Sequence, residues 1–175
     1  LARAGHKDAQ AAMKALTQVL PGTVFYQVMG HTLDEMVSEA ERFTAIAPNL
    51  GLKIPATLLG CQFAARVSPQ VTVAVTGGIA PGQAYLAAEA GAHYIIPYVN
   101  RLTRFVGDGP GVVSRLAMAV EGSACEVLAA GIKSPSEAMD TLFAGADHLS
   151  LPWEVILAMA DNALTEKAML DFEAA

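Results

Sequence analysis

The chain has 175 residues, of which 53% are hydrophobic and 16% are charged, and its formal net charge is −6. A disordered chain is excluded, because disorder needs low hydrophobicity and high charge. No uncharged apolar run approaches the roughly 18 residues that span a bilayer, and no Lys/Arg cluster provides a nucleic-acid surface. We therefore expect one domain, residues 1–175, with no membrane or nucleic-acid partner.

The cysteines, histidines and first residues indicate the cellular setting. Cys61 and Cys125 are far apart and form no CxxC motif, which favours free buried thiols over a disulfide. The four histidines show no HxH or HExxH spacing, so we expect no metal site. The first residues carry charge but no apolar run of the signal-peptide kind. Together these features predict a reduced, cytoplasmic setting.

Apolar periodicity predicts a first helix and then six strands, each followed by a helix. The first helix covers residues 6–20 and ends at Pro21-Gly22, and Thr32 with Glu35 forms a capping box after the first strand. The predicted strands cover residues 23–29, 51–55, 71–75, 93–97, 125–130 and 147–151. The helices after them begin near residues 32, 58, 80, 110, 134 and 152, and a last helix covers residues 164–172.

Regular alternation of strands and helices predicts an α/β fold with a parallel sheet. Neither GxGxxG nor GxxxxGK[ST] occurs, so nucleotide-binding doubly wound folds lose support. A (β/α)8 TIM barrel typically takes about 250 residues, which is more than this chain has. Six units after a leading helix therefore predict an incomplete (β/α)8 barrel without its first two strands, with an open six-stranded sheet as the alternative.

Lys53 is the first candidate for chemistry, because it lies inside the apolar predicted strand 51–55. Lysine is rarely buried without a purpose. A low dielectric disfavours the ammonium form, and the neutral amine can attack a carbonyl and form a Schiff base. A snorkelling or ion-paired lysine is the alternative.

Polar residues also mark the ends of other predicted strands. Gln27, Thr76 and Tyr98 lie at or near carboxyl ends of strands, where barrel sites are built, although each alone suits core packing or a turn. Arg101, expected in a loop, is either a solvated side chain or a bidentate ligand for a phosphate or carboxylate. The glycine-rich segment 107–111 is a weaker candidate for binding an anion through backbone N–H groups.

The chain resembles the small transaldolase/fructose-6-phosphate aldolase family over nearly its whole length. The matching segments, in order and spacing, are FYQVM at 25–29, GLKIP at 51–55, AGAHYIIPYVNR at 90–101, VLAAGIKSP at 127–135 and AGADHLSLP at 144–152. The PYVNR stretch is the most specific of these. The resemblance implies a (β/α)8 barrel that forms or cleaves a C–C bond between a dihydroxyacetone-type ketone and an aldehyde. It implies a sugar or sugar-phosphate substrate and no metal or organic cofactor.

The resemblance also implies roles for individual residues. Lys53 matches the lysine that forms the Schiff base. Gln27, Thr76 and Tyr98 match the groups that hold the catalytic water, with Tyr98 as the acid/base anchor. Arg101 matches a phosphate-binding arginine. Gln27 and Tyr98 resemble the aldolase subgroup, since the transaldolase subgroup has Glu and Phe there.

Two departures from the family pattern are visible. Gly131 stands where the family usually has a serine that helps to hold phosphate, although the backbone N–H of Gly131 can still donate. Family members begin with two strands that supply an aspartate and an asparagine, and we assign neither residue. The family also assembles into rings through C-terminal helices, so we expect a homo-oligomer.

Three alternatives to an aldolase stay open. One is a transaldolase that transfers a dihydroxyacetone unit between sugar phosphates. Another, of a different class, is a non-catalytic barrel fragment or assembly module. Isomerisation of a sugar phosphate ranks third. That chemistry would need a glutamate or histidine at a strand end in place of Lys53, and none is evident there.

Overall fold

The computed structural model describes residues 8–173, in which strands and helices alternate after a first helix. The strands are β1 Val24–Gln27, β2 Leu50–Pro55, β3 Val73–Thr76, β4 Tyr94–Ile96, β5 Glu126–Ala129 and β6 His148–Leu149. The helices are α1 Ala9–Val19, α2 Leu33–Thr44, α3 Leu58–Val67, α4 Pro81–Glu89, α5 Val99–Val106, α6 Gly109–Val120, α7 Pro135–Phe143, α8 Trp153–Ala160 and α9 Ala163–Glu173.

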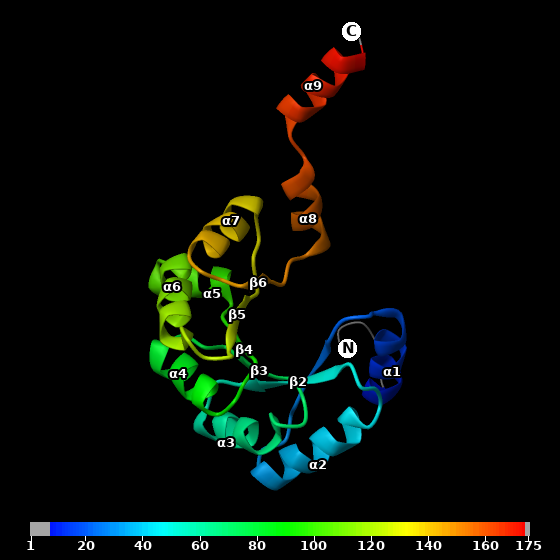
Figure 1. Cartoon of the computed structure of the whole chain (residues 1–175), viewed down its shortest axis with the longest axis vertical. Helices are drawn as coiled ribbons and strands as arrows, with labels where there is room; N and C mark the ends of the chain where they lie inside the picture. The colour runs from blue at the N-terminus through cyan, green and yellow to red at the C-terminus, as the bar shows by residue number, and fades with distance from the viewer. Residues whose placement is uncertain (1–7, 174–175) are drawn as a thin grey trace.

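The six strands form one parallel sheet in the order β1-β2-β3-β4-β5-β6. The order never reverses, unlike that of a doubly wound sheet, and the helices form an arc outside the strands (Figure 1). The structure therefore has six consecutive units of a (β/α)8 barrel, as the sequence predicts. The sheet is open, with β1 and β6 at its edges.

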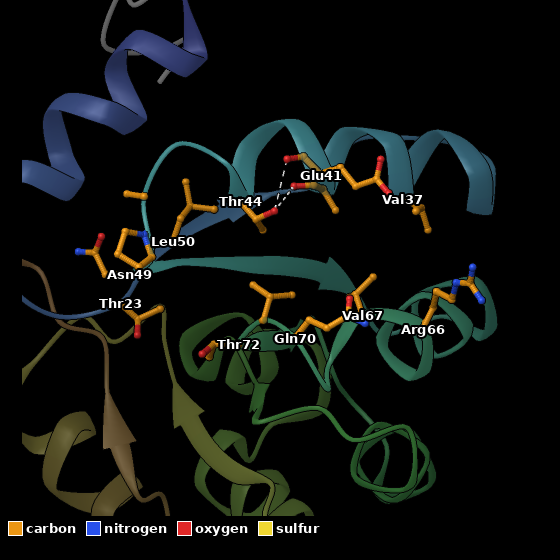
Figure 2. A pocket seen from close by; sticks show the side chains of 14 residues that line it. Thr23, Val37, Glu41, Thr44, Asn49, Leu50, Arg66, Val67, Gln70 and Thr72 are labelled. Atoms are coloured by element: carbon orange, nitrogen blue, oxygen red, sulfur yellow. Dashed lines mark hydrogen bonds between the residues drawn. The ribbon is translucent and has the colours of Figure 1, made fainter.

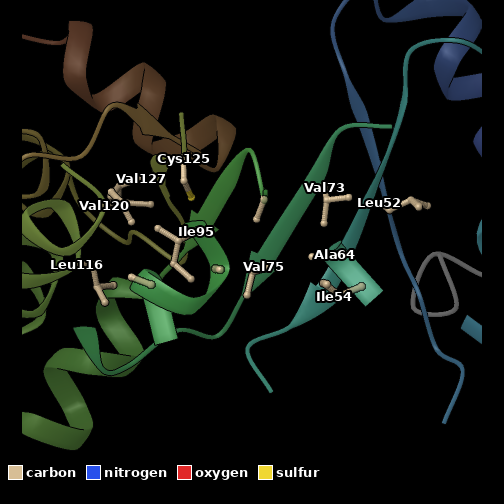
Figure 3. Packing of buried hydrophobic residues seen from close by; sticks show 14 of the residues in the cluster. Leu52, Ile54, Ala64, Val73, Val75, Ile95, Leu116, Val120, Cys125 and Val127 are labelled. Carbon is tan, nitrogen blue, oxygen red and sulfur yellow. The ribbon is translucent and has the colours of Figure 1, made fainter. Parts of the chain in front are cut away.

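The hydrophobic core lies between the outer face of the sheet and the surrounding helices (Figure 3). Leu52 and Ile54 of β2 pair in register with Val73 and Val75 of β3, and all four side chains are completely buried. Successive side chains of a strand point to opposite faces. Lys53, between Leu52 and Ile54, therefore points to the concave face of the sheet.

Side-chain caps fix the loops at the carboxyl ends of the strands. The hydroxyl of Thr32 accepts the Glu35 N–H at 3.3 Å, while the Glu35 carboxylate accepts the N–H groups of His31 and Thr32 at 2.8 and 3.2 Å. The predicted capping box is thus confirmed. Ser134 likewise accepts the Glu137 N–H at the start of α7.

The structure corrects the sequence-based prediction in two places. Helix α5 was not predicted; it begins after Tyr98, which has no side-chain cap, and ends at Gly107 with φ of 81°. Arg101 therefore lies in a helix and not in a loop. The sixth strand is also shorter than predicted, since only His148 and Leu149 pair with β5.

The C-terminal helices extend away from the arc of sheet and helices (Figure 1). In α8 only Val155 is buried, and every residue of α9 is exposed. The helices found between residues 8 and 173 are all too short or too polar to cross a membrane.

Candidate active site

Lys53 lies on the concave face of β2, two residues before the end of the strand. It is half-buried, whereas its neighbours Leu52 and Ile54 are fully buried. Among the residues that the structure describes, no hydrogen-bond or ion-pair partner of the Lys53 side chain is found. A lysine so placed is open to a ligand that approaches the concave face.

Gln27 lies beside Lys53 in the sheet. The two residues are register partners of β1 and β2, so both side chains point to the concave face. The Gln27 amide donates hydrogen bonds to the backbone carbonyls of Lys53, at 2.9 Å, and Val28, at 3.3 Å. These bonds hold the nitrogen of the amide, and the amide oxygen is an acceptor.

Thr76 and Tyr98 form a direct pair at the carboxyl ends of β3 and β4. Thr76, which is buried, donates from its hydroxyl to the Tyr98 phenol oxygen at 2.8 Å. The backbone of Tyr98 is held by a bridge to Ala130, and the Val99 N–H donates to the Ala130 carbonyl at 2.8 Å. Since a phenol is both donor and acceptor, the Tyr98 O–H remains able to donate to another group.

Arg101 and Gly131 are both neighbours of Tyr98. The Arg101 guanidinium carbon is 5.0 Å from the centre of the Tyr98 ring, which is cation–π geometry. Gly131 has a φ of 71°, and a Cβ built on it would lie 3.5 Å from the Tyr98 Cβ. Gly131 therefore packs against the base of the Tyr98 side chain.

The six predicted site residues form two groups near the carboxyl ends of the strands. Direct contacts join Gln27 to Lys53, and the second group consists of Thr76, Tyr98, Arg101 and Gly131. Strand pairing links the two groups, because Lys53 is the register partner of Ala74, two residues before Thr76.

The glycine-rich segment 107–111 does not provide the anion site considered from the sequence. Its Asp108 carboxylate accepts the Gly111 N–H at 2.8 Å, so the first turn of α6 already has a negatively charged cap. A second anion at this position would meet the charge of Asp108.

Two side chains that the sequence analysis gave no role connect the loops around the site. Gln83 of α4 donates to the carbonyl of Ala56 at 2.8 Å, which ties the loop after β3 to the loop after β2. Glu137 of α7 accepts the Lys133 N–H at 2.6 Å and the Asn100 amide at 3.3 Å. The bonds to Ala56 and Asn100 depend on tertiary structure, so spacing along the chain gave no signal for them, whereas the bond to Lys133 joins residues four apart at the start of α7.

A row of aromatic and charged side chains lines the concave face toward the amino ends of the strands. The Tyr94 ring meets Phe25 edge-on at 6.0 Å between centroids, and His148 at 5.7 Å. The Nε2 atom of His148 lies 2.9 Å from the Glu126 carboxylate. In the sequence these residues alternate with apolar ones, which is the pattern of a strand with two different faces.

A cavity of about 600 Å3 lies near the amino ends of the strands, between α2 and α3 (Figure 2). Its walls include Leu50 at the start of β2 and Thr72 just before β3, whereas Lys53 and Thr76 lie toward the ends of these strands. This cavity is therefore separate from the candidate site. Within residues 8–173, no group of three or more His, Cys, Asp or Glu residues could hold a metal ion.

Comparison with known proteins identifies the family of the chain. The family model described as Transaldolase/Fructose-6-phosphate aldolase matches residues 4–175. The chain belongs to this family. It is 31% identical to probable transaldolases of Geotalea uraniireducens and Geotalea daltonii, over 175 residues that cover 98% of this chain and 81% of each relative. A family named for two enzyme activities thus includes this sequence.

Solved structures are similar in fold. A mandelate oxidase, crystallised with (S)-2-phenylpropionate, superimposes with a TM-score of 0.63 at 17% sequence identity. The matched region covers 79% of this chain and 51% of the oxidase. A putative deoxyribose-phosphate aldolase from Coccidioides immitis gives 0.61 at 20% identity, covering 81% of this chain and 66% of the other. At these identities the likeness extends to the fold alone.

Proposed function

We propose that the protein is a Schiff-base aldolase whose nucleophile is Lys53. The observation that supports this most strongly is a half-buried lysine between two fully buried residues of β2, on the concave face of a barrel-like sheet. Active sites of (β/α)8 barrels are built at the carboxyl ends of the strands. Gln27, Thr76 and Tyr98 lie at that edge and supply polar groups for proton transfer.

In the proposed reaction the neutral amine of Lys53 attacks the carbonyl of a ketone, and loss of water gives an iminium ion. A base removes the proton of the hydroxyl on the β carbon, the bond between the α and β carbons breaks to release an aldehyde, and its electron pair moves toward the iminium to leave an enamine. Protonation and hydrolysis then return the lysine; addition of the enamine to an aldehyde runs the reaction toward synthesis. We assign the proton transfers to water held by Gln27, Thr76 and Tyr98.

The proposed substrate is a sugar or sugar phosphate with a dihydroxyacetone-type donor end. Arg101 supports recognition of a phosphate or carboxylate, because a guanidinium binds such groups bidentately. At Gly131 only the backbone N–H is available for an anion, which gives Arg101 the larger share of the binding energy. The proposed location is the cytoplasm, which suits the two free cysteines.

A second candidate is transfer of a dihydroxyacetone unit, a transaldolase reaction, which the names of the two Geotalea relatives favour. The two reactions share the lysine enamine and differ in what accepts it. If Gln27→Glu with Tyr98→Phe raises transfer relative to free aldol cleavage, the aldolase assignment gains support. Unchanged partitioning counts against it.

Trapping the Schiff base tests the proposal. The protein is incubated with dihydroxyacetone or hydroxyacetone and borohydride, and the modified peptide is identified by mass spectrometry. We expect one reduced adduct on Lys53 and none in Lys53→Met. Absence of an adduct, or an adduct that survives Lys53→Met, would refute the proposed chemistry and favour a non-catalytic barrel module.

We further propose that the protein assembles as a homo-oligomer through its C-terminal helices. Trp153 of α8 and Leu164 and Phe172 of α9 are between 65% and 77% exposed, which is unusual for large apolar side chains on neighbouring helices. Sedimentation of the protein with and without residues 161–175 checks this assembly.

A further inference from the structure

Glu39 of α2 is a buried carboxylate on the outer side of β1, 8% exposed. Its two oxygens accept three hydrogen bonds: one from the Tyr26 hydroxyl at 2.6 Å, and two from the N–H groups of Met29 at 3.0 Å and Gly30 at 2.9 Å. Buried carboxylates are costly unless they are hydrogen-bonded in this way. A carboxylate at this buried position is therefore explained only by a role of the hydrogen bonds that it accepts.

The groups bound by Glu39 lie on both sides of Gln27 in the sequence. Tyr26 precedes Gln27 in β1 and points outward, with its ring stacked on Phe43 of α2 at 3.5 Å between centroids. Met29 and Gly30 begin the loop that follows the strand. One carboxylate thus holds the chain just before and just after Gln27, from the side opposite the candidate site.

Tyr26 is the side-chain hydrogen-bond donor of this cluster. Burial, together with the hydrogen bond to Glu39 and its charge, raises the pKa of Tyr26, so the phenol stays protonated and donates. Gln27 itself is held on the other face by its bond to the Lys53 carbonyl at 2.9 Å. The backbone around Gln27 is therefore held from one face and its amide nitrogen from the other, which restricts the positions that its amide oxygen can take.

We propose that Glu39 is a positioning residue for Gln27: it fixes the end of β1 so that the Gln27 amide can orient water for proton transfer at Lys53. This inference rests on the Schiff-base function proposed above. It makes Glu39 act through Gln27 and gives it no contact with substrate. Loss of the carboxylate should slow the steps that need oriented water and leave formation of the lysine adduct in place.

A double-mutant cycle on kcat tests this role. Glu39→Gln keeps the volume of the side chain and one oxygen for the backbone N–H groups, but it removes the charge and the acceptor for Tyr26. We expect Glu39→Gln to lower kcat about 10-fold with KM within about 2-fold, and to have no further effect when Gln27→Ala is present. Equal losses in both backgrounds, or unchanged kcat in Glu39→Gln, would overturn the role.

Two further measurements separate this role from fold damage and from failure of the proposed function. Asp147→Asn is a control for the loss of a carboxylate that accepts a backbone N–H, because Asp147, which is exposed, accepts the Val127 N–H at 2.8 Å near the opposite ends of the strands. We expect its kcat to be unchanged, and an equal loss there would overturn the proposal. Borohydride trapping should still label Lys53 in Glu39→Gln. An adduct with additive kcat losses refutes only the role of Glu39, whereas no adduct in the unsubstituted protein refutes the Schiff-base function and the role together.

Discussion

Thr76 donates a 2.8 Å hydrogen bond to the phenol oxygen of Tyr98 and so joins the ends of β3 and β4. The bond uses one lone pair of the phenol oxygen and sets the direction in which the Tyr98 proton can be given away. If Tyr98 handles protons near Lys53, its orientation depends on the hydroxyl of Thr76.

Thr76→Val removes this bond at nearly constant volume. We expect kcat to fall about 10-fold, a part of the 10²- to 10⁴-fold that acid–base catalysis typically contributes, while trapping at Lys53 persists. Unfolding free energy should fall by about 1 kcal/mol for the lost buried hydrogen bond. Steady-state kinetics and denaturant unfolding measure the two effects.

Thr72→Val is the control for this change, because Thr72 lies just before the same strand, at the edge away from the candidate site. It should leave kcat unchanged. If both threonine variants lose activity equally, the Thr76–Tyr98 bond has no special part in proton transfer.

Arg101 is expected to distinguish phosphorylated from neutral acceptors. Arg101→Met should raise KM for a phosphorylated aldehyde about 10- to 100-fold, the range that corresponds to a charged hydrogen bond of about 1.5–3 kcal/mol. Its contact with the Tyr98 ring, at 5.0 Å, predicts an additional loss of kcat that neutral aldehydes share.

Arg101→Lys separates these two effects. It retains a positive charge but loses the planar group that stacks on Tyr98. We expect it to recover part of the KM for the phosphorylated aldehyde and little of the kcat. A KM change that is the same for neutral and phosphorylated aldehydes would contradict phosphate binding by Arg101.

Gly131 is expected to tolerate the volume of a small side chain but not its backbone preference. Its φ of 71° is costly for residues with a Cβ, by about 1–2 kcal/mol, although a Cβ would be 3.5 Å from its neighbour in Tyr98. Gly131→Ala should therefore lower Tm by a few degrees. Gly131→Asn should lower it less, because asparagine adopts this conformation more readily. If Tm is lower for Gly131→Asn than for Gly131→Ala, a steric clash and not the backbone conformation would be the cause of the lost stability.

The sheet could be predicted from the sequence because short apolar segments, separated by turn residues and helices, leave a local signal. Segments such as residues 71–75 are β-branched and mostly apolar runs that end at turn residues, and their regular alternation with helices indicates a parallel order. Lys53 was recognisable for the same reason, as a charge inside such a run. The carboxyl ends of parallel strands meet at one edge, so Gln27, Thr76 and Tyr98 could be grouped before their contacts were known.

The remaining features depend on tertiary contacts. Helix α5 has no capping side chain at Tyr98, so its start leaves no local signal. Glu39 had a partial signal, since it lies on the buried stripe of α2 with Met36 and Phe43, where a charge is unexpected. Its partners in β1 could not be deduced, because they depend on how α2 packs against the strand.

Cys125 predicts a loss of stability at alkaline pH. Burial, and then the negative charges of Glu126 and Asp147, raise the pKa of the Cys125 thiol to about 11 from its usual value near 9. Between these values the unfolded chain releases a proton that the folded chain keeps, so the stability is complete below about pH 9 and decreases as the pH rises toward 11. The decrease is on the order of 3 kcal/mol at most, since one pKa unit corresponds to about 1.4 kcal/mol.

Cys125→Ala removes this titration and should flatten the curve of unfolding free energy against pH between 9 and 11, although the lost packing lowers the whole curve. Cys61→Ala is the comparison, because burial also raises the pKa of Cys61, but no charged neighbour adds to it. Its effect on the slope should be smaller. Denaturant unfolding at pH 8, 9, 10 and 11 measures the slopes, and equal slopes in the parent and Cys125→Ala would mean that the thiolate of Cys125 reaches solvent in the folded protein.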